Sequence, residues 1–203
     1  MEEKRMGNTV TLCGSVSERP RFSHYSRSKN FYTFTLNVSR LSGAEDSVSI
    51  VCEESLLSAD IPGDCDSLRV TGELRSYNNK SGVGNKLVLF VYAFDMQFCS
   101  DEAQNDICIL GTLCKKPNLR VTPLGREICD LLIAVNRPFG HSDYLPCICW
   151  GQNAGMVSNW EVGTVVGLEG RIQSRNYIKN INGEQVSKTA FEVSVTSISK
   201  VVT

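Results

Sequence analysis

The 203-residue sequence repeats itself at a spacing of about one domain. The segment NTVTLCG, from Asn8 to Gly14, is followed by the similar segment NDICILG, from Asn105 to Gly111. Four residues recur at an offset of 97 (111 − 14 = 97): Gly14 and Gly111, Pro20 and Pro117, Arg40 and Arg137, Asp46 and Asp143. Because a fixed period reflects a repeated structural unit, we expect one small domain of roughly 100 residues duplicated in tandem.

Short runs rich in Val, Ile, Phe and Tyr recur in both halves between clusters of Gly, Pro, Asn and Asp, which is typical of strands. They are Val10–Val16, Phe31–Val38, Ser47–Cys52, Leu68–Leu74 and Leu87–Phe98, then Ile107–Leu113, Ile128–Val135, Tyr144–Trp150, Val165–Ile172 and Lys188–Ile198. One helix-like stretch per half, Glu54–Ala59 and Asn153–Trp160, falls between the third and fourth runs. Five strands with a helix before the fourth are the plan of the OB-fold, a partly open Greek-key barrel.

The sequence therefore predicts an all-β protein of two tandem OB-fold domains with one short helix each. We place the domains at residues 1–99 and 106–203, joined by the polar linker 100–105. Gly72 and Gly170 fall within the fourth strand of each half and predict a bulge or a sharp bend there. The dipeptide Asn182-Gly183 predicts a tight hairpin turn before the last strand.

Charge and cysteine usage limit the classes of function. Residues 1–103 carry 11 Lys and Arg against 14 Asp and Glu, whereas residues 104–203 carry 10 against 8, so no strongly basic surface is expected overall. Nine cysteines without a CxxC pair, and with only two His residues, predict reduced thiols used as small apolar side chains rather than metal ligands. The sequence has no signal-like or membrane-spanning apolar run, so we expect a cytoplasmic protein with no membrane partner, no metal and no cofactor.

The second half concentrates the side chains that suit a nucleic-acid surface. The aromatic residues Phe139, Tyr144, Trp150 and Tyr177 alternate with the cations Arg137, Arg171, Arg175 and Lys179. Tyr144 and Trp150 are six residues apart on one expected strand and should point to the same face. Flat rings offer a stacking surface to any base and nearby cations follow the phosphates, a combination typical of single-strand binding. Each aromatic residue taken alone is equally consistent with a place in the core.

The ordered motifs of the second half resemble the bacterial-type single-stranded DNA-binding protein (SSB) family. They are Asn105 with Leu110-Gly111-Thr-Leu, Pro117 to Gly125, Ala134 to Arg137, Asp143 to Gly151, Gly163 to Tyr177, and Asn182-Gly-Glu. The resemblance implies a homo-oligomeric, non-catalytic OB-fold protein that wraps single-stranded DNA and associates with the nucleoid. It also implies that the principal base-stacking positions are Phe139, Tyr144, Trp150 and Tyr177.

The first half has lost most of those positions. Ser42, Ser47 and Glu53 stand where Phe139, Tyr144 and Trp150 stand in the second half. Only Tyr77, which answers Tyr177, and the retained Arg40 remain as expected contacts of the first half. Either this half is a structural partner that imitates a second subunit, or it binds through another surface, formed by Tyr25, Phe31, Tyr32 and Phe34 with Arg21, Arg27 and Lys29.

Two further readings stay open. A protein-interaction scaffold with weak or no DNA binding, in a replication or mobile-element complex, fits the acidic first half and its lost aromatics. RNA is an alternative ligand because stacking surfaces accept both nucleic acids. By analogy with the family we expect a homodimer that supplies four OB-folds. We expect no acidic recruiting tail after Thr203, and an enzyme is disfavoured because no nucleophile, metal or phosphate-loop motif occurs.

Overall fold

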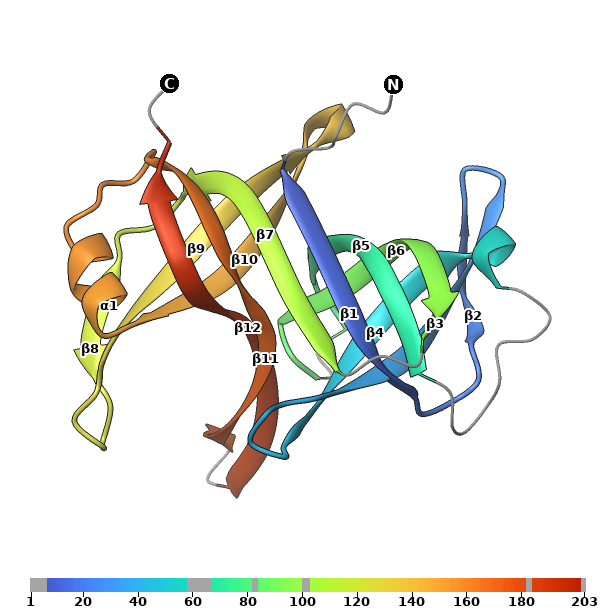
Figure 1. The fold of residues 1–203 in the computed structure, drawn as a ribbon, viewed down its shortest axis with the longest axis horizontal. Coiled ribbons are helices and arrows are strands. Elements are labelled where there is room, and N and C mark those ends of the chain that lie inside the picture. The colour runs from blue at the N-terminus through green and yellow to red at the C-terminus, as the bar shows by residue number, and fades with distance from the viewer. Residues whose placement is uncertain (1–6, 58–66, 82–83, 100–102, 182–183, 202–203) are drawn as a thin grey trace. The chain divides into compact units, whose positions relative to one another are not determined.

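The computed structural model describes residues 7–57, 67–81, 84–99, 103–181 and 184–201, and most of them lie in strands (Figure 1). The backbone forms two compact units. The amino-terminal unit consists of Asn8–Arg75 and Leu89–Asp106, and the carboxy-terminal unit of Met1–Gly7, Ser76–Val88 and Ile107–Thr203. The end of one hairpin from the first repeat, Ser76–Val88, therefore belongs to the carboxy-terminal unit.

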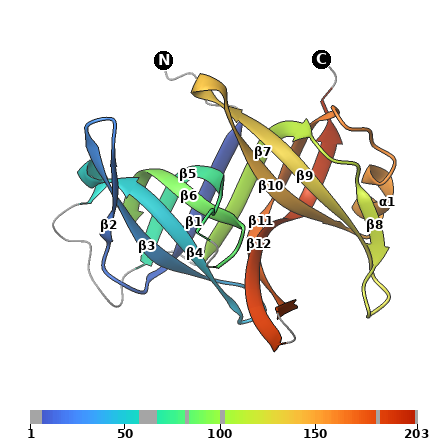
Figure 2. The same cartoon turned by 180° about the vertical axis from the view of Figure 1, so that it is seen from behind.

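The carboxy-terminal unit contains a closed five-stranded barrel. Its elements are β7 (Gln104–Leu113), β8 (Asn118–Val121), β9 (Glu127–Arg137), β10 (His141–Trp150), α1 (Gln152–Val157), β11 (Val165–Ile181) and β12 (Glu184–Lys200). Antiparallel pairs join β7 to β9, β9 to β10, β12 to β11 and β11 to β7. The parallel pair of β10 with β12 closes the ring. This is the OB-fold order, and β9 and β10 run side by side in Figure 2.

The first repeat forms the same barrel, most of it within the amino-terminal unit. Its elements are β1 (Asn8–Val16), β2 (Arg21–Ser26), β3 (Lys29–Ser39), β4 (Glu45–Glu53), the 3₁₀ turn η1 (Glu54–Leu56), β5 (Ser67–Asn78) and β6 (Leu87–Phe98). The registers coincide at the sequence offset: Asp46 pairs with Val38 in β4 and β3, and Asp143 pairs with Val135 in β10 and β9. The tandem OB-fold prediction is thus confirmed by strand pairing as well as by strand position.

All ten predicted runs are strands, and the structure adds two short ones, β2 and β8. The predicted helix Asn153–Trp160 is found as α1, whereas at Glu54–Ala59 the described residues form only the 3₁₀ turn η1. The Asn182-Gly183 turn lies outside the described residues. A register shift between Glu169 and Gly170 confirms the predicted irregularity at Gly170. The pairs of β5 with β1 include Gly72 and show no such shift.

The barrel interiors are lined by alternate residues of the longer strands, whereas β2 and β8 have no buried residue. On β10 the odd positions Asp143, Leu145, Cys147 and Cys149 are buried. All eight described cysteines are free thiols, and five of them are buried, so burial accounts for most of them as apolar packing. None of the helices among the described residues has the length and hydropathy that a membrane span requires.

Candidate nucleic-acid interface

A buried ion pair holds the turn between β9 and β10. The Arg137 Nε lies 3.0 Å from Oδ2 of Asp143, whose side chain is fully buried. The Asp143 Oδ1 also accepts a hydrogen bond of 2.7 Å from the Ser76 backbone N–H, and the Tyr144 N–H donates to the Ser76 Oγ at 2.8 Å. These contacts lie within the carboxy-terminal unit and fix the backbone at Tyr144.

The equivalent pair of the first repeat, Arg40 and Asp46, has the same construction. The Arg40 guanidinium donates from Nε at 2.7 Å and from Nη2 at 2.5 Å to the buried Asp46 carboxylate. The hydrogen bond to Asp46 raises the pKa of Arg40 above its usual value. Both predicted phosphate contacts, Arg40 and Arg137, are therefore placed in ion pairs that stabilise the fold, and their contact with nucleic acid stays a prediction.

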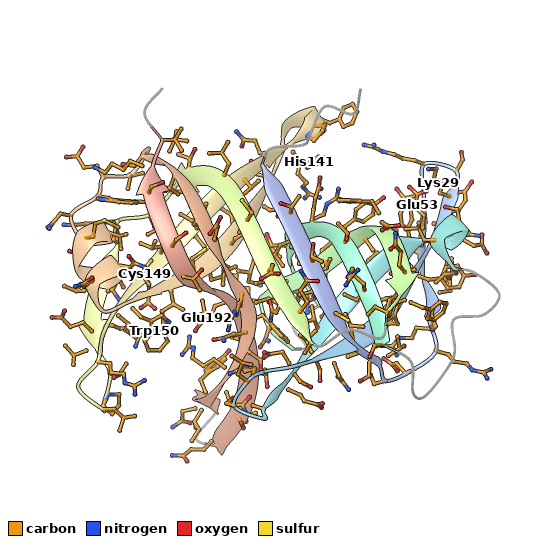
Figure 3. The ribbon with its side chains drawn as sticks, viewed as in Figure 1. Lys29, Glu53, His141, Cys149, Trp150 and Glu192 are labelled. Atoms are coloured by element: carbon orange, nitrogen blue, oxygen red, sulfur yellow. The ribbon has the colours of Figure 1, made fainter. Side chains whose placement is uncertain are left out.

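Tyr144 and Trp150 are exposed on the outer side of β10, with exposed fractions of 44% and 40%. Six residues of strand separate them by roughly 20 Å, so they offer two separate stacking positions along one strand. The Trp150 Nε1–H donates to the Ser194 Oγ of β12 at 3.2 Å, which fixes the edge of the indole and leaves its face available. Figure 3 shows Trp150 beside the barrel wall at the end of β10, near Glu192.

Strand register places cations on the same outer side as Trp150. Ser194 lies opposite Ile148 on β10 and opposite Arg171 on β11. Because directly opposed residues share a face, the exposed Arg171 is on the face that carries the Trp150 contact. The register shift at Gly170 leaves Thr196 of β12 without an opposed residue, so both Ile198 and Val195 of β12 are buried while β11 alternates regularly up to the buried Ile172.

Farther along β11, Arg175 and Tyr177 form a second aromatic and cationic group. The Arg175 Cζ lies 5.9 Å from the centroid of the Tyr177 ring, and its Nε lies 3.3 Å from Oε2 of Glu192. Arg171, Arg175 and Tyr177 occupy alternate positions, which direct their side chains to one side of the ribbon. The side chain of Lys179 lies outside the described residues.

Phe139 and Tyr77 are the most exposed of the predicted aromatic contacts. Phe139 is 78% exposed in the turn η2 (Pro138–Gly140), and its φ of 66° is in the left-handed region. A bulky residue there indicates local strain. Tyr77 is 52% exposed and follows Ser76, so it belongs to the same compact unit as Tyr144. The contacts of Ser76 were not expected, because no local sequence signal distinguishes it from other serines.

An ionic network occupies the corresponding face of the amino-terminal unit. Glu53, at the position of Trp150, accepts from the Lys29 Nζ at 2.7 Å and from the Tyr92 hydroxyl at 3.3 Å. Figure 3 shows Lys29 and Glu53 next to each other. The hydrogen bond to Glu53 raises the pKa of Lys29 above its usual value. The Arg75 Cζ lies 3.8 Å from the centroid of the Tyr92 ring.

Register also identifies what Tyr92 replaces. Val51 opposes Tyr92 across β4 and β6, as Ile148 opposes Ser194 across β10 and β12. Tyr92 on β6 thus occupies the position of Ser194 on β12. In the second repeat the aromatic residue of this strand pair is Trp150 on β10, whereas in the first repeat it is Tyr92 on β6. It lies between Arg75 and Glu53, so its surroundings are ionic instead of open.

Comparison with known proteins identifies relatives of the second repeat. Residues 104–201 match the single-strand binding protein family. Single-stranded DNA-binding protein 3 of Listeria innocua is 37% identical over 92 residues, which cover 42% of this chain and 57% of the relative. Its counterpart of the same name in Streptococcus agalactiae is 36% identical over 92 residues, 42% of this chain and 66% of the relative. The chain thus spans between about half and two thirds of the relatives' length.

A solved structure resembles this chain over both repeats. The wild-type single-stranded DNA binding protein from Thermus aquaticus matches with a TM-score of 0.74 and covers 97% of this chain and 93% of its own. At 19% sequence identity this likeness concerns the fold alone.

Proposed function

The chain belongs, through residues 104–201, to the single-strand binding protein family, and from that premise we propose that it is a non-catalytic single-stranded DNA-binding protein acting in DNA replication, recombination or repair. The observation that carries the proposal is the outer face of β10, where Tyr144 and Trp150 are exposed on one side. Arg171 is on that face by register, and Arg175 and Tyr177 follow on β11. Rings would stack on bases while the guanidinium groups contact phosphates.

The two repeats differ at the stacking positions, and this difference indicates which of them binds DNA. We assign the main binding role to residues 106–203, because Glu53 and its ionic network stand in place of Trp150 on the corresponding face of residues 1–99. Phe139, Tyr77, Arg137, Arg40 and Lys179 remain proposed contacts. We also propose a cytoplasmic, nucleoid-associated homodimer that supplies four OB-folds.

Tryptophan fluorescence with added oligo-dT tests the proposal directly. The chain has two tryptophans, and Trp160 is only 9% exposed, so quenching reports on Trp150. We expect quenching at low salt that added salt reverses, because cations release counterions when they bind phosphate. No quenching and no mobility shift at low salt would reject single-strand binding.

A labelled oligonucleotide allows affinity to be measured without the fluorescence of Trp150, which is itself removed in the variants. In fluorescence anisotropy with fluorescein-labelled oligo-dT, Trp150→Ala should lower affinity by about 5- to 150-fold, the equivalent of about 1–3 kcal/mol per stacked base. Trp150→Phe keeps a ring face and should retain most of the affinity. Equal loss in both variants would mean that the indole N–H, and not its face, matters.

The second candidate function is a protein-interaction scaffold with weak or no DNA binding. The ionic network around Glu53 favours it for the first repeat. Intact anisotropy-detected binding to oligo-dT would exclude it as the sole function. The same titration with oligo-U tests RNA as the ligand.

A further inference from the structure

The amino-terminal unit concentrates cations and rings in one short segment. Residues 19–29, RPRFSHYSRSK, contain four Lys and Arg and no Asp or Glu, although residues 1–103 as a whole carry 11 against 14. The same segment holds Phe22, His24 and Tyr25. At the offset of 97 the second repeat has Leu119, Val121 and Thr122 instead. The rings are therefore specific to the repeat that has lost the inherited stacking positions.

A register shift puts two of these rings on one side of the ribbon formed by β2 and β3. Residues three apart on a regular strand face opposite sides. Between Phe22 and His24 the pairing shifts, so that Phe22 opposes Tyr32, His24 opposes Phe31 and Tyr25 opposes Asn30. Because opposed residues share a face and β3 alternates, Phe22 and Tyr25 lie on one side and His24 on the other.

The two rings on that side are exposed, and one of them, Phe22, packs against Tyr32. Phe22 is 58% and Tyr25 66% exposed. Phe22 contacts Tyr32 edge to face, with centroids 6.0 Å apart and an interplanar angle of 87°. On the other side, His24 stacks on the buried Phe31 at 4.8 Å and 8°, which anchors the ribbon to the barrel.

The ionic surroundings distinguish Phe22 and Tyr25 from the other aromatic residues nearby. The Tyr32 hydroxyl and the Asn30 amide donate to Glu54 at 3.1 and 3.0 Å, and Lys29 pairs with Glu53. Those two carboxylates therefore already have donors. Of the four aromatic residues that the sequence pointed to, Phe31 and Phe34 are buried and Tyr32 is half-buried, so Tyr25 is the exposed one. Phe22 is a second exposed ring on the same strand.

The turn between β2 and β3 carries a cation where glycine is favoured. Arg27 and Ser28 have φ values of 48° and 61°. Two-residue hairpin turns with two positive φ angles favour Asn-Gly, so Arg-Ser carries a conformational cost. This arrangement sets Arg27 at the end of a ribbon whose strand β2 begins with the exposed Arg21.

We propose that the β2–β3 ribbon is a second single-stranded DNA-binding surface, on which Phe22 and Tyr25 stack against bases and Arg21 and Arg27 contact phosphates. Among the described strands, β2 is the terminal one of the sheet order, and none of the others pairs with its outer edge. Exposed rings next to cations fit a single strand, whose bases are unpaired and whose backbone is anionic. The ribbon acts independently of the Trp150 face.

The test measures fluorescein-labelled oligo-dT binding in a double-substitution series. Phe22→Ala with Tyr25→Ala should lower the affinity for a long oligomer by about tenfold or more, given the value of stacked bases. In the Trp150→Ala background the residual binding should persist and then disappear when both ribbon rings are removed. Bromodeoxyuridine oligomers should photocrosslink to Tyr25 or Phe22, as mapped by mass spectrometry.

Matched controls keep folding and function apart. Leu119→Ala with Leu124→Ala removes exposed apolar side chains from the equivalent part of the second repeat and should leave affinity unchanged. Arg21→Glu with Arg27→Glu keeps the rings and should weaken binding and its salt dependence. If the ring variants fold normally by circular dichroism yet bind and crosslink like the unsubstituted protein, the ribbon proposal is wrong.

The outcomes for the two surfaces are distinguishable. Loss of all binding in Trp150→Ala, with no effect of the ribbon variants, rejects this inference and leaves the proposed function intact. Loss in the ribbon variants alone supports the ribbon and rejects the Trp150 face as the main site. Absence of oligo-dT binding in every variant and in the unsubstituted protein rejects both.

Discussion

At the scale of a single residue, Asp143 both forms a buried ion pair and lies next to the proposed binding residue Tyr144. Its carboxylate pairs with Arg137 and accepts the Ser76 N–H, and it is fully buried. The next residue, Tyr144, is exposed on the proposed binding face. A buried charge with charged and backbone partners is costly to disrupt, because the partner left behind stays buried without compensation. The repeat of this pair as Arg40 and Asp46 indicates that it stabilises the barrel.

We therefore expect Asp143→Ala to reduce the free energy of unfolding by about 3–5 kcal/mol, the range for breaking a buried pair. Urea denaturation followed by circular dichroism measures the change. Asp46→Ala should act similarly, because its carboxylate is equally buried. Glu161→Ala, at an exposed position, is the control. A loss for Asp143→Ala no larger than that of this control would contradict a structural role.

The arginines of the site illustrate the limit of prediction at this scale. Residue type and spacing were enough to select Arg40 and Arg137, but type alone does not distinguish a phosphate contact from an ion pair. That distinction depends on Asp46 and Asp143, which lie six residues away and meet the arginines only when the strands pair. Sequence spacing likewise gave no signal for Ser76, whose partners are more than 60 residues distant.

Within the strand elements, the two repeats place a buried thiol at the same point. Cys52 on β4 and Cys149 on β10 are 97 residues apart (149 − 52 = 97) and both fully buried. Burial raises the pKa of Cys52 to about 11 and that of Cys149 to about 12, because a thiolate is poorly solvated there. The folded state therefore favours the neutral thiols.

The sign of the pH dependence follows from the raised pKa values. Unfolded thiols ionise near pH 9, so the stabilising contribution is complete below that pH and is lost as pH rises towards 11–12. We expect the urea midpoint to fall between pH 8 and pH 10, and Cys149→Ala to reduce that fall. Cys108→Ala, at an exposed thiol, should leave it unchanged. Parallel profiles for Cys149→Ala and the unsubstituted protein would count against this cause.

Glycine in the fourth strand permits close approach of the neighbouring strand. A Cβ on Gly170 would collide with the Ser194 carbonyl, and one on Gly72 with the Tyr92 carbonyl. We expect Gly170→Ala to destabilise the fold by about 1–3 kcal/mol, the usual cost of overpacking. Gly167→Ala on the same strand is a matched control, because its added Cβ would meet only Val201 at 3.8 Å. Thermal unfolding of both variants measures the difference, and equal stability would exclude a steric role for Gly170.

Strands with strong hydrophobic periodicity were predictable and the short ones were not. Ten runs matched strands because each has alternating residues that face a barrel interior. β2 and β8 have little burial: every residue of β2 except Ser26 is exposed. Their strand structure depends on pairing with β3 and β9 instead of on an apolar face. Exposure is also what makes β2 available as a binding surface.

For the whole molecule, the duplication was visible in sequence, whereas the grouping of chain segments was not. The repeat predicts two barrels, but Ser76–Val88 belongs to the unit formed by the other repeat. Lys188 donates to the Gly84 carbonyl at 3.0 Å within that unit. Contacts of this kind depend on tertiary packing, which a periodic pattern does not encode.

The proposed homodimer should sediment with a mass of about 44.8 kDa, twice the 22.4 kDa of one chain. Sedimentation as a monomer at micromolar concentration would reject it.

The net charge of −1 makes the salt dependence of binding a test of local cations. If overall charge controlled association, affinity for oligo-dT would change little with salt. On the proposed face Arg171 and Arg175 neutralise phosphates, and each phosphate contact contributes about −0.7 to the slope of log affinity against log salt for a single strand. Removing both guanidinium groups, as Arg171→Ala with Arg175→Ala, should therefore flatten the slope by about 1.4 units. Lys115→Ala with Lys116→Ala removes the same charge from exposed positions in the connection between β7 and β8 and should preserve the slope. A slope that responds equally to both pairs would mean that general charge, and not the arrangement beside Trp150, attracts the nucleic acid.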